Sequence, residues 1–392
     1  MEDWIKKKIG LDKTQRLTRE AISDYQVKKL KETITIAKEN SPFYRKHLKG
    51  VEPEHIESIS DIQTIPFLEA EDIRANGMKM LCTGQDEITR IVTLSTSGTT
   101  GKPKRIFFTA DDQELTIDFF HEGMKYIVNK EDVVLILMPC KTPGSIGDLL
   151  ARGLERLGVK TIPYGIPEDL TKLSEILRSE KVTSIVGIPI HVLQLAESHG
   201  TTEDTRIKTV LLSADYISDS LSKRIEDKWN CKVFEHYGST EIGYGGAVQC
   251  KFTRGMHPRE ADIYFEIVDP DTGLVLPDGE FGEIVVTTLT RKGMPFIRYR
   301  TGDYGRWLKG NCPCGTVLKS LDKVRHRIDD EILFNGYKID ITKLDEALFS
   351  IDGLCDYEVK IVEDKGKLRL KLDLNFSVGE GNLTGKKRRI NR

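Results

Sequence analysis

Short apolar runs that alternate with longer amphipathic stretches constrain the fold of this chain more than any other sequence feature. The runs are rich in β-branched residues and lie at residues 133–137, 160–162, 184–186, 209–212 and 232–234. Such alternation is typical of βαβ units, and a continuous apolar run indicates a strand that is buried on both faces. The sequence therefore predicts an α/β fold that contains a mostly parallel sheet.

Different patterns precede and follow this region. Apolar positions at helical spacing within residues 14–48 predict an N-terminal helical segment, and strands separated by turn signals after residue 262 predict a β-rich subdomain. A chain of 392 residues is too long for one ordinary core. We expect a large N-terminal domain of residues 1–327 and a small α+β C-terminal domain of residues 328–392.

Charge and cysteine content exclude several classes of protein. Lys and Arg number 59 against 61 Asp and Glu, so no global field favours nucleic acid or an anionic membrane. No apolar run approaches the ~20 residues that span a bilayer, and the first residues lack the pattern of a secretory leader. The seven cysteines are odd in number and sparse, which argues against a disulfide framework. We expect a cytoplasmic protein that binds neither nucleic acid nor membrane.

A candidate phosphate-binding loop lies at residues 94–104, with the sequence LSTSGTTGKPK. Its glycines allow close backbone approach to an anion, and its hydroxyl and ammonium groups can bind phosphate oxygens. It is not a Walker loop, because Gly98 stands too close to the Gly101-Lys102 pair and Pro103 replaces the magnesium-binding hydroxyl. By composition alone, a polar surface loop is the alternative.

The order of three segments carries a resemblance. Residues 97–104 (SGTTGKPK), 235–241 (EHYGSTE) and 298–303 (RYRTGD) resemble the motifs of the adenylate-forming superfamily, which includes acyl-CoA synthetases, peptide-synthetase adenylation domains and luciferases. Residues 37–45 and 65–67 are similar to its phenylacetate-CoA ligase branch, and the resemblance covers residues 25–340. It implies a large AMP-binding domain followed by a mobile lid, which is shortened here.

The resemblance implies a role for each nucleotide-binding residue. Tyr237 would stack on adenine, Glu241 would hold the Mg²⁺ that bridges the ATP phosphates, and Asp303 would bind the ribose hydroxyls. Alone, a tyrosine is more often a core residue, a glutamate a surface charge and an aspartate a turn residue. The implied nucleotide contacts are Ser95, Ser97, Gly98, Thr99, Thr100, Lys102, Ser213, Ala214, Asp215, His236, Tyr237, Gly238, Ser239, Arg300 and Asp303, with Thr240 and Glu241 as catalytic residues. For Arg300 a structural ion pair is the alternative.

The implied reaction is attack of a substrate carboxylate on the α-phosphate of ATP, with pyrophosphate as the leaving group. Positioning and charge neutralisation dominate such a transfer, which needs no general base. In relatives a lid lysine in a Gly-Lys context assists, and Lys386 is the candidate, with Asp329 or Asp330 as the hinge pivot. Few residues separate this hinge from Lys386, so a solvated basic tail is the alternative.

Three cysteines and one histidine form a candidate metal site. Cys250 and His257 follow the Glu241 motif, and Cys312 and Cys314 lie in one tight turn. Thiolate and imidazole ligands suit a closed structural zinc site, and some phenylacetate-CoA ligase-like proteins carry zinc in this region. Ordinary turn cysteines are the alternative, since Cys-x-Cys is a weak signal.

The acyl substrate is the least determined part of the prediction. Relatives shape the acyl pocket with segments that correspond here to Tyr164, Gly165, His191 and His236, and the branch suggests an aromatic acid. The alternatives are turns at strand ends for the Gly and Pro positions and core residues for the two histidines. Transfer of the acyl group to coenzyme A is the leading expectation. AMP transfer to a non-carboxylate acceptor such as a deazaflavin and a catalytically degenerate nucleotide-binding protein are the alternatives. The oligomeric state stays open, with a homodimer as one option.

Overall fold

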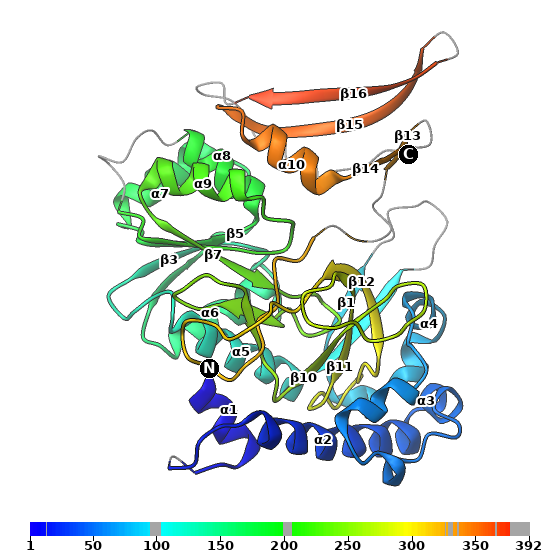
Figure 1. The fold of residues 1–392 in the computed structure, drawn as a ribbon. Helices are drawn as coiled ribbons and strands as arrows, with labels where there is room; N and C mark the ends of the chain where they lie inside the picture. Colours follow the sequence, from blue (N-terminus) through cyan, green and yellow to red (C-terminus); the bar gives the residue numbers. More distant parts are fainter. Residues whose placement is uncertain are drawn as a thin grey trace. The chain divides into compact units, whose positions relative to one another are not determined.

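The computed structural model (Figure 1) describes residues 1–12, 14–94, 103–198, 206–325, 327, 332–334, 337–364 and 367–376. The chain forms two compact units, each built from two stretches of sequence. Unit 1 consists of Met1–Tyr126 and Tyr237–Val324, and unit 2 consists of Ile127–His236 and Arg325–Arg392. The predicted boundary near residue 328 stays a prediction.

Unit 2 contains the predicted parallel sheet. Its strands run in the order β4-β3-β5-β6-β7, and every neighbouring pair is parallel. Their bounds are β3 Val133–Leu137, β4 Lys160–Pro163, β5 Ser184–Gly187, β6 Thr209–Leu212 and β7 Lys232–Tyr237. The prediction of an α/β fold is confirmed, because the five apolar runs lie in these strands.

Helices connect the strands of unit 2. They are α6 (Ile146–Glu155), α7 (Leu170–Ser179), α8 (Pro189–Ser198) and α9 (Asp219–Trp229). Figure 1 draws α7, α8 and α9 side by side along one face of the sheet, and the apolar residues of all three helices share one core with β3, β5 and β6. This core fixes the strands, so that the loops at their carboxyl ends have defined positions.

The C-terminal part of unit 2 packs on α8 and α9. It contains β13 (Ile332–Phe334), β14 (Tyr337–Ile339), α10 (Ile341–Phe349), β15 (Leu354–Asp364) and β16 (Lys367–Phe376). The Glu346 carboxylate accepts hydrogen bonds from the backbone N–H groups of Asp219 and Ser220, at 2.8 and 3.0 Å. Arg224 on α9 donates to the carbonyl of Leu354 at 2.6 Å. Polar contacts therefore hold α10 and β15 against the first turns of α9.

Unit 1 combines helices with small antiparallel sheets, as the β-rich pattern predicts. Its helices are α1 (Glu2–Ile9), α2 (Arg19–Asn40), α3 (Pro42–His47), α4 (Ala70–Asn76) and α5 (Ala110–Met124), with four short 3-10 turns at Pro53–His55, Ile59–Thr64, Gly77–Met80 and Gln85–Glu87. Its strands are β1 (Ile88–Leu94), β2 (Lys104–Thr109), β8 (Ala247–Gln249), β9 (Met256–Pro258), β10 (Ile263–Val268), β11 (Gly282–Thr288) and β12 (Tyr299–Gly305). The pairs β1-β2 and β8-β9 and the sheet β10-β11-β12 are antiparallel.

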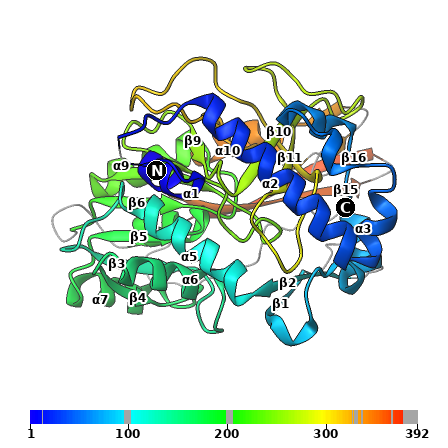
Figure 2. The ribbon, with the colours of Figure 1, turned by 90° about the horizontal axis from the view of Figure 1, so that it is seen from below.

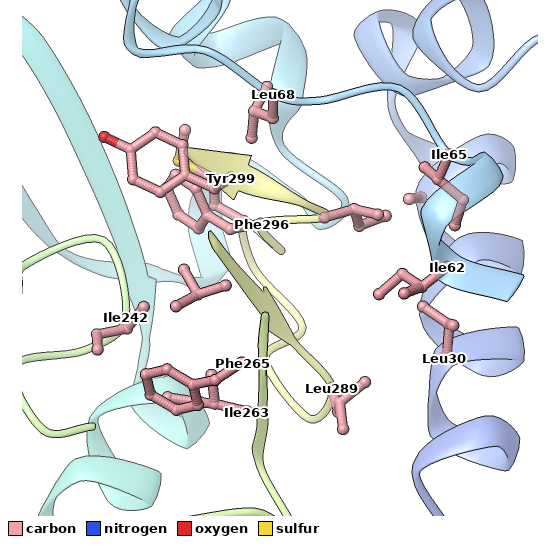
Figure 3. Packing of buried hydrophobic residues seen from close by; sticks show 14 of the residues in the cluster. Leu30, Ile62, Ile65, Leu68, Ile242, Ile263, Phe265, Leu289, Phe296 and Tyr299 are labelled. Carbon is pink, nitrogen blue, oxygen red and sulfur yellow. The ribbon is translucent and has the colours of Figure 1, made fainter. Parts of the chain in front are cut away.

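The long helix α2 anchors the core of unit 1. The hydroxyl of Thr18 accepts from the backbone N–H of Ala21 and caps its first turn. Leu30, Ile34 and Ala37 share one face and are fully buried. Figure 2 shows α1, α2 and α3 from below. Figure 3 shows Leu30 near Ile62 in this core, which also includes residues of β10, β11 and β12.

No helix in the described part of the chain is both long and apolar enough to cross a lipid bilayer. The longest one, α2, has 22 residues and is interrupted throughout by Lys, Glu, Arg and Asp.

Candidate active site and metal centre

The two ends of the phosphate loop belong to the β1-β2 hairpin. Leu94 ends β1, Lys104 begins β2, and the two residues are register partners. The predicted phosphate contacts Ser95, Ser97, Gly98, Thr99, Thr100 and Lys102 lie between them, outside the described residues. Lys386 and the hinge candidates Asp329 and Asp330 also lie outside the described residues.

Tyr237 and Asp303, predicted to bind adenine and ribose, are in direct contact in unit 1. The phenol of Tyr237, at the end of β7, donates to Oδ2 of Asp303 on β12 at 2.7 Å. The Asp303 backbone N–H donates to the hydroxyl of Thr301 at 3.0 Å, which fixes the local backbone. Burial, followed by the Asp303 carboxylate, raises the pKa of Tyr237 well above its ordinary value. The Tyr237 phenol therefore stays protonated near neutral pH and acts as a hydrogen-bond donor to the Asp303 carboxylate.

Glu241, the predicted magnesium ligand, lies in the segment that follows β7 and is 5% exposed. Its carboxylate forms an ion pair with Lys104 and accepts a hydrogen bond from the hydroxyl of Tyr299 at 3.2 Å. Lys104 also donates to the Tyr299 hydroxyl at 3.3 Å. A carboxylate is a hard oxygen ligand of the kind that Mg²⁺ prefers, so Glu241 can supply one ligand to this ion. Thr240, Ser239 and Gly238 precede Glu241 in the same segment.

The sequence interpretation missed Lys104 and Tyr299 as partners of Glu241. Lys104 is the last residue of the SGTTGKPK segment, so its place in the motif was the available signal. Tyr299 lies four residues before Asp303, inside the quoted RYRTGD segment. Their proximity to Glu241 depends on contacts between β2, β12 and the segment after β7, which sequence spacing does not reveal.

Arg300 makes contacts of the structural kind. Its Nε donates to Oε2 of Glu283 at 2.6 Å, and its Nη2 donates to the carbonyl of Pro270 at 2.8 Å. Its Nη1 lies 3.7 Å from Oε1 of Glu69. These contacts agree with the ion-pair alternative, and the predicted contact of Arg300 with nucleotide stays a prediction.

The predicted acyl and adenine-loop residues of unit 2 follow consecutive strands of the parallel sheet. Tyr164 and Gly165 follow β4, His191 follows β5, Ser213, Ala214 and Asp215 follow β6, and His236 lies near the end of β7. The carboxyl ends of parallel strands meet at one edge of a sheet, where ligands of open α/β folds bind. The sheet therefore gathers these predicted residues at one edge.

Local contacts order this edge. The hydroxyl of Ser213 lies 2.7 Å from Nδ1 of His236, and both side chains are buried. Ala214 has a φ of 75°, a left-handed conformation that L side chains rarely adopt and that often marks a functional turn. Burial lowers the pKa of His191, with the Asp215 carboxylate acting in the opposite direction. The His191 imidazole is therefore neutral at pH 7.

The four predicted metal ligands converge in unit 1. The ligand atoms of Cys250, His257, Cys312 and Cys314 all lie within 4.8 Å of one another. The sulfurs of Cys250 and Cys312 are 3.6 Å apart, and the sulfur of Cys314 lies 3.4 Å from Nε2 of His257. Two thiolates at ~2.3 Å from a tetrahedral Zn²⁺ stand about 3.8 Å apart, so the cluster has the right dimensions.

A second contact orients the histidine of this cluster. Nδ1 of His257 donates to the backbone carbonyl of Lys319 at 3.0 Å. In the neutral imidazole this hydrogen bond places the proton on Nδ1, so that the lone pair is on Nε2, 3.4 Å from the sulfur of Cys314, which is the arrangement of a histidine that binds metal. The residues therefore fit a Cys3His zinc site in composition, spacing and tautomer.

Comparison with known proteins identifies the family. Residues 21–290 match the family described as AMP-binding enzyme. The chain is 29% identical over 363 residues to a phenylacetate-coenzyme A ligase of Pseudomonas putida, covering 90% of this chain and 81% of the relative. It is 27% identical over 386 residues to the Escherichia coli phenylacetate-coenzyme A ligase, covering 95% of this chain and 86% of the relative.

A solved structure has the same fold. The crystal structure of 2-hydroxyisobutyryl-CoA ligase in the postadenylation state superimposes with a TM-score of 0.79 and 23% identity, covering 91% of this chain and 78% of that one. This likeness extends beyond the AMP-binding match, because it spans most of the chain. The chain belongs to the AMP-binding enzyme family.

Proposed function

We propose that this protein activates a carboxylic acid with ATP to give an acyl-adenylate and pyrophosphate, and then transfers the acyl group to coenzyme A with release of AMP. The observation that carries the proposal is the convergence of Tyr237, Glu241 and Asp303 in one buried region of unit 1, where Lys104 partners Glu241. Several relatives over most of the chain are named phenylacetate-coenzyme A ligases, which supports coenzyme A as the acceptor.

Each residue of this region suits one part of Mg²⁺·ATP. The Asp303 carboxylate accepts from two ribose hydroxyls, and the ring of Tyr237 offers a flat face to adenine. Glu241 supplies an oxygen ligand for Mg²⁺, which neutralises charge on the phosphates during transfer. Lys104 holds a positive charge beside Glu241. If Mg²⁺ replaces Lys104 as the partner of the Glu241 carboxylate, the Lys104 ammonium group can bind a phosphate oxygen.

The acid is held in this proposal by the carboxyl edge of the unit 2 sheet, with Tyr164, Gly165, His191 and His236 as pocket residues. The names of the relatives support an aromatic acid as the substrate. A neutral His191 favours an uncharged acyl chain beside it, since it offers no counter-charge. Lys386 is proposed to approach the acyl carboxylate from the lid during adenylation.

The Cys3His cluster is proposed as a structural zinc site. Its four ligands leave no open coordination position for a substrate, which separates it from catalytic zinc sites. The metal would join the β8-β9 hairpin, which carries His257, to the turn that carries Cys312 and Cys314. Its contribution is then to the stability of unit 1.

ATP–pyrophosphate exchange over a panel of aryl and aliphatic acids tests the proposed function. We expect exchange with one class of acid, followed by AMP release that depends on coenzyme A. Glu241→Ala should abolish exchange, Lys386→Ala should reduce it, and Glu280→Ala, at an exposed position of unit 1, should leave it unchanged.

The outcomes of this assay separate the alternatives. Exchange without any acid but with a deazaflavin would identify AMP transfer to a non-carboxylate acceptor. ATP binding with no exchange under any condition would identify a degenerate nucleotide-binding protein. Either result contradicts the proposed function.

A further inference from the structure

Three consecutive backbone carbonyls beginning at Glu241 are bound by three buried side chains. The carbonyl of Glu241 accepts from Nη1 of Arg291 at 2.5 Å, and the carbonyl of Ile242 accepts from Nη2 of Arg259 at 2.5 Å. The carbonyl of Gly243 accepts from the hydroxyl of Thr116 at 2.7 Å. We call Arg291, Arg259 and Thr116 the carbonyl clamp.

Burying the two arginines of the clamp is costly. Arg291 is 7% exposed and Arg259 is 4% exposed, and burial lowers the pKa of Arg291 and lowers that of Arg259 to about 10. Their described hydrogen-bond acceptors are backbone carbonyls rather than carboxylates. Desolvation of both guanidinium groups costs free energy, which the carboxylates of Asp112 and Glu241 near Arg291 and of Asp262 near Arg259 offset in part. Their arrangement around one short segment suggests a positional role.

The clamp connects the Glu241 segment to the elements on both sides of it. Nη2 of Arg291 donates to the carbonyl of Phe107 on β2 at 2.7 Å, and β2 also carries Lys104. Nη1 of Arg259 donates to the carbonyl of Leu115 on α5 at 3.1 Å, next to Thr116 on the same helix. Arg291 therefore sets the separation between the strand of Lys104 and the backbone of Glu241.

Aromatic rings fix the guanidinium groups themselves. The guanidinium carbon of Arg291 lies 4.4 Å from the ring centroid of Phe108 and 5.1 Å from that of Phe296. The guanidinium carbon of Arg259 lies 5.4 Å from the ring centroid of Phe119. Stacking of this kind restricts both planar groups, so the directions of their hydrogen bonds are fixed.

We propose that Arg291, Arg259 and Thr116 are positioning residues that orient the Glu241 carboxylate for the Mg²⁺ of bound ATP by fixing the three carbonyls that follow its side chain. The inference rests on the proposed function. A ligand carboxylate must be held within about 0.5 Å of its productive position, and groups behind metal ligands typically alter metal affinity by about 10-fold to 100-fold when changed. Lysine keeps the charge but cannot bridge two carbonyls with a planar fork.

Arg291→Lys and Arg259→Lys test the clamp, with Arg298→Lys as the matched control. Arg298 is 3% exposed in the same unit, forms an ion pair with Glu266 and donates to the carbonyls of Gln63 and Ile65, so it is a buried arginine that does not bind the three clamped carbonyls. ATP binding is measured by calorimetry with and without Mg²⁺, together with thermal unfolding. We expect the affinity for ATP in the presence of Mg²⁺ to fall about 10-fold or more in both clamp variants, with unchanged affinity in its absence. Arg298→Lys should change only the unfolding temperature.

Two results would overturn the inference: wild-type affinity for Mg²⁺·ATP in both clamp variants, or an equal loss in Arg298→Lys. If the lysine variants do not fold, Thr116→Val removes the third donor with little change of shape, and an unchanged magnesium dependence there also overturns it. The proposed function fails separately. Wild-type protein that binds Mg²⁺·ATP but exchanges pyrophosphate with no acid refutes acid activation, while the binding comparison still decides the role of the clamp.

Discussion

Lys104 and Glu241 form an ion pair inside unit 1, with side chains that are 10% and 7% exposed. They are 137 residues apart in sequence, and the Tyr299 hydroxyl contacts both. Because the pair is desolvated, each charge depends on the other far more than it would at the surface. Lys104 therefore supplies a counter-charge to Glu241 and holds the carboxylate in position before a cation arrives.

Removing Lys104 should destabilise the protein strongly. Lys104→Met removes the ion-pair partner of the buried Glu241 carboxylate, and we expect a loss of about 3–5 kcal/mol of unfolding free energy. Lys104→Met combined with Glu241→Gln should recover most of that loss, since the carboxylate that lost its ion-pair partner is then neutral. The urea midpoint measures both effects.

Lys223→Met is the control for this prediction. Lys223 pairs with Asp227 at an exposed position, where the side chains are 73% and 64% exposed, so its loss should cost less than about 0.5 kcal/mol. A Lys104→Met protein with a wild-type midpoint would contradict the prediction.

The contact between Tyr237 and Asp303 predicts a loss of ATP affinity in Tyr237→Phe. A hydrogen bond to a charged acceptor contributes about 1.5–3 kcal/mol, so we expect affinity for ATP to fall about 10-fold as Asp303 loses its fixed orientation. The pKa of Tyr237 is raised, so the phenol stays protonated and the ratio of affinities should be constant from about pH 6 to about pH 9. Calorimetry at several pH values measures this ratio.

Tyr304→Phe serves as the matched variant. Tyr304 lies in the same strand as Asp303, and its hydroxyl donates to the backbone carbonyl of Phe281 at 3.2 Å rather than to a carboxylate. Its ATP affinity should match wild type. Equal affinities for Tyr237→Phe and wild type, or a ratio that changes with pH, would refute the assignment.

Zinc removal should lower the stability of unit 1. Protein purified without chelator should contain about one zinc ion per chain. A strong chelator should lower the midpoint temperature of unfolding, because the metal no longer connects the separate segments that carry the four ligands. Cys312→Ser should lose the metal. Cys82→Ser, at a buried thiol outside the cluster, should retain it. Metal analysis that finds equal zinc in the two variants would exclude the site.

Glu346→Ala should loosen the C-terminal segment of unit 2. Its carboxylate caps two N–H groups at the start of α9, a contribution of about 1 kcal/mol. We expect hydrogen exchange in α10 and β15 to accelerate severalfold while the strands β3, β5 and β6 stay protected. Glu363→Ala, at an exposed position on β15, is the control. Unchanged exchange in α10 would show that apolar packing alone holds the segment.

The sequence was sufficient for the parts of this protein that depend on local pattern. Each strand of the parallel sheet contains an apolar run, as β5 contains residues 184–186, because a strand that is buried on both faces must be hydrophobic along its whole length. The Cys3His ligands were also visible, since thiol and imidazole groups stand out by residue type. Residues 95–102 and 386 lie outside the described structure, so the prediction for the phosphate loop and lid lysine rests on the sequence motifs.

Tertiary structure decided which groups surround the predicted nucleotide site. The sequence alone determined the α/β class, and it identified Tyr237, Glu241 and Asp303 as motif residues and the four side chains of the candidate metal site. It did not reveal that Lys104 pairs with Glu241, because the SGTTGKPK motif does not say which residue its last lysine contacts. It also did not reveal that Arg291 and Arg259 bind the carbonyls beside Glu241, because an isolated Arg carries no pattern and most such residues are solvated. Their positions follow from how β2, α5 and β12 pack around the segment after β7, and long-range packing is set by the whole core rather than by any local stretch of sequence.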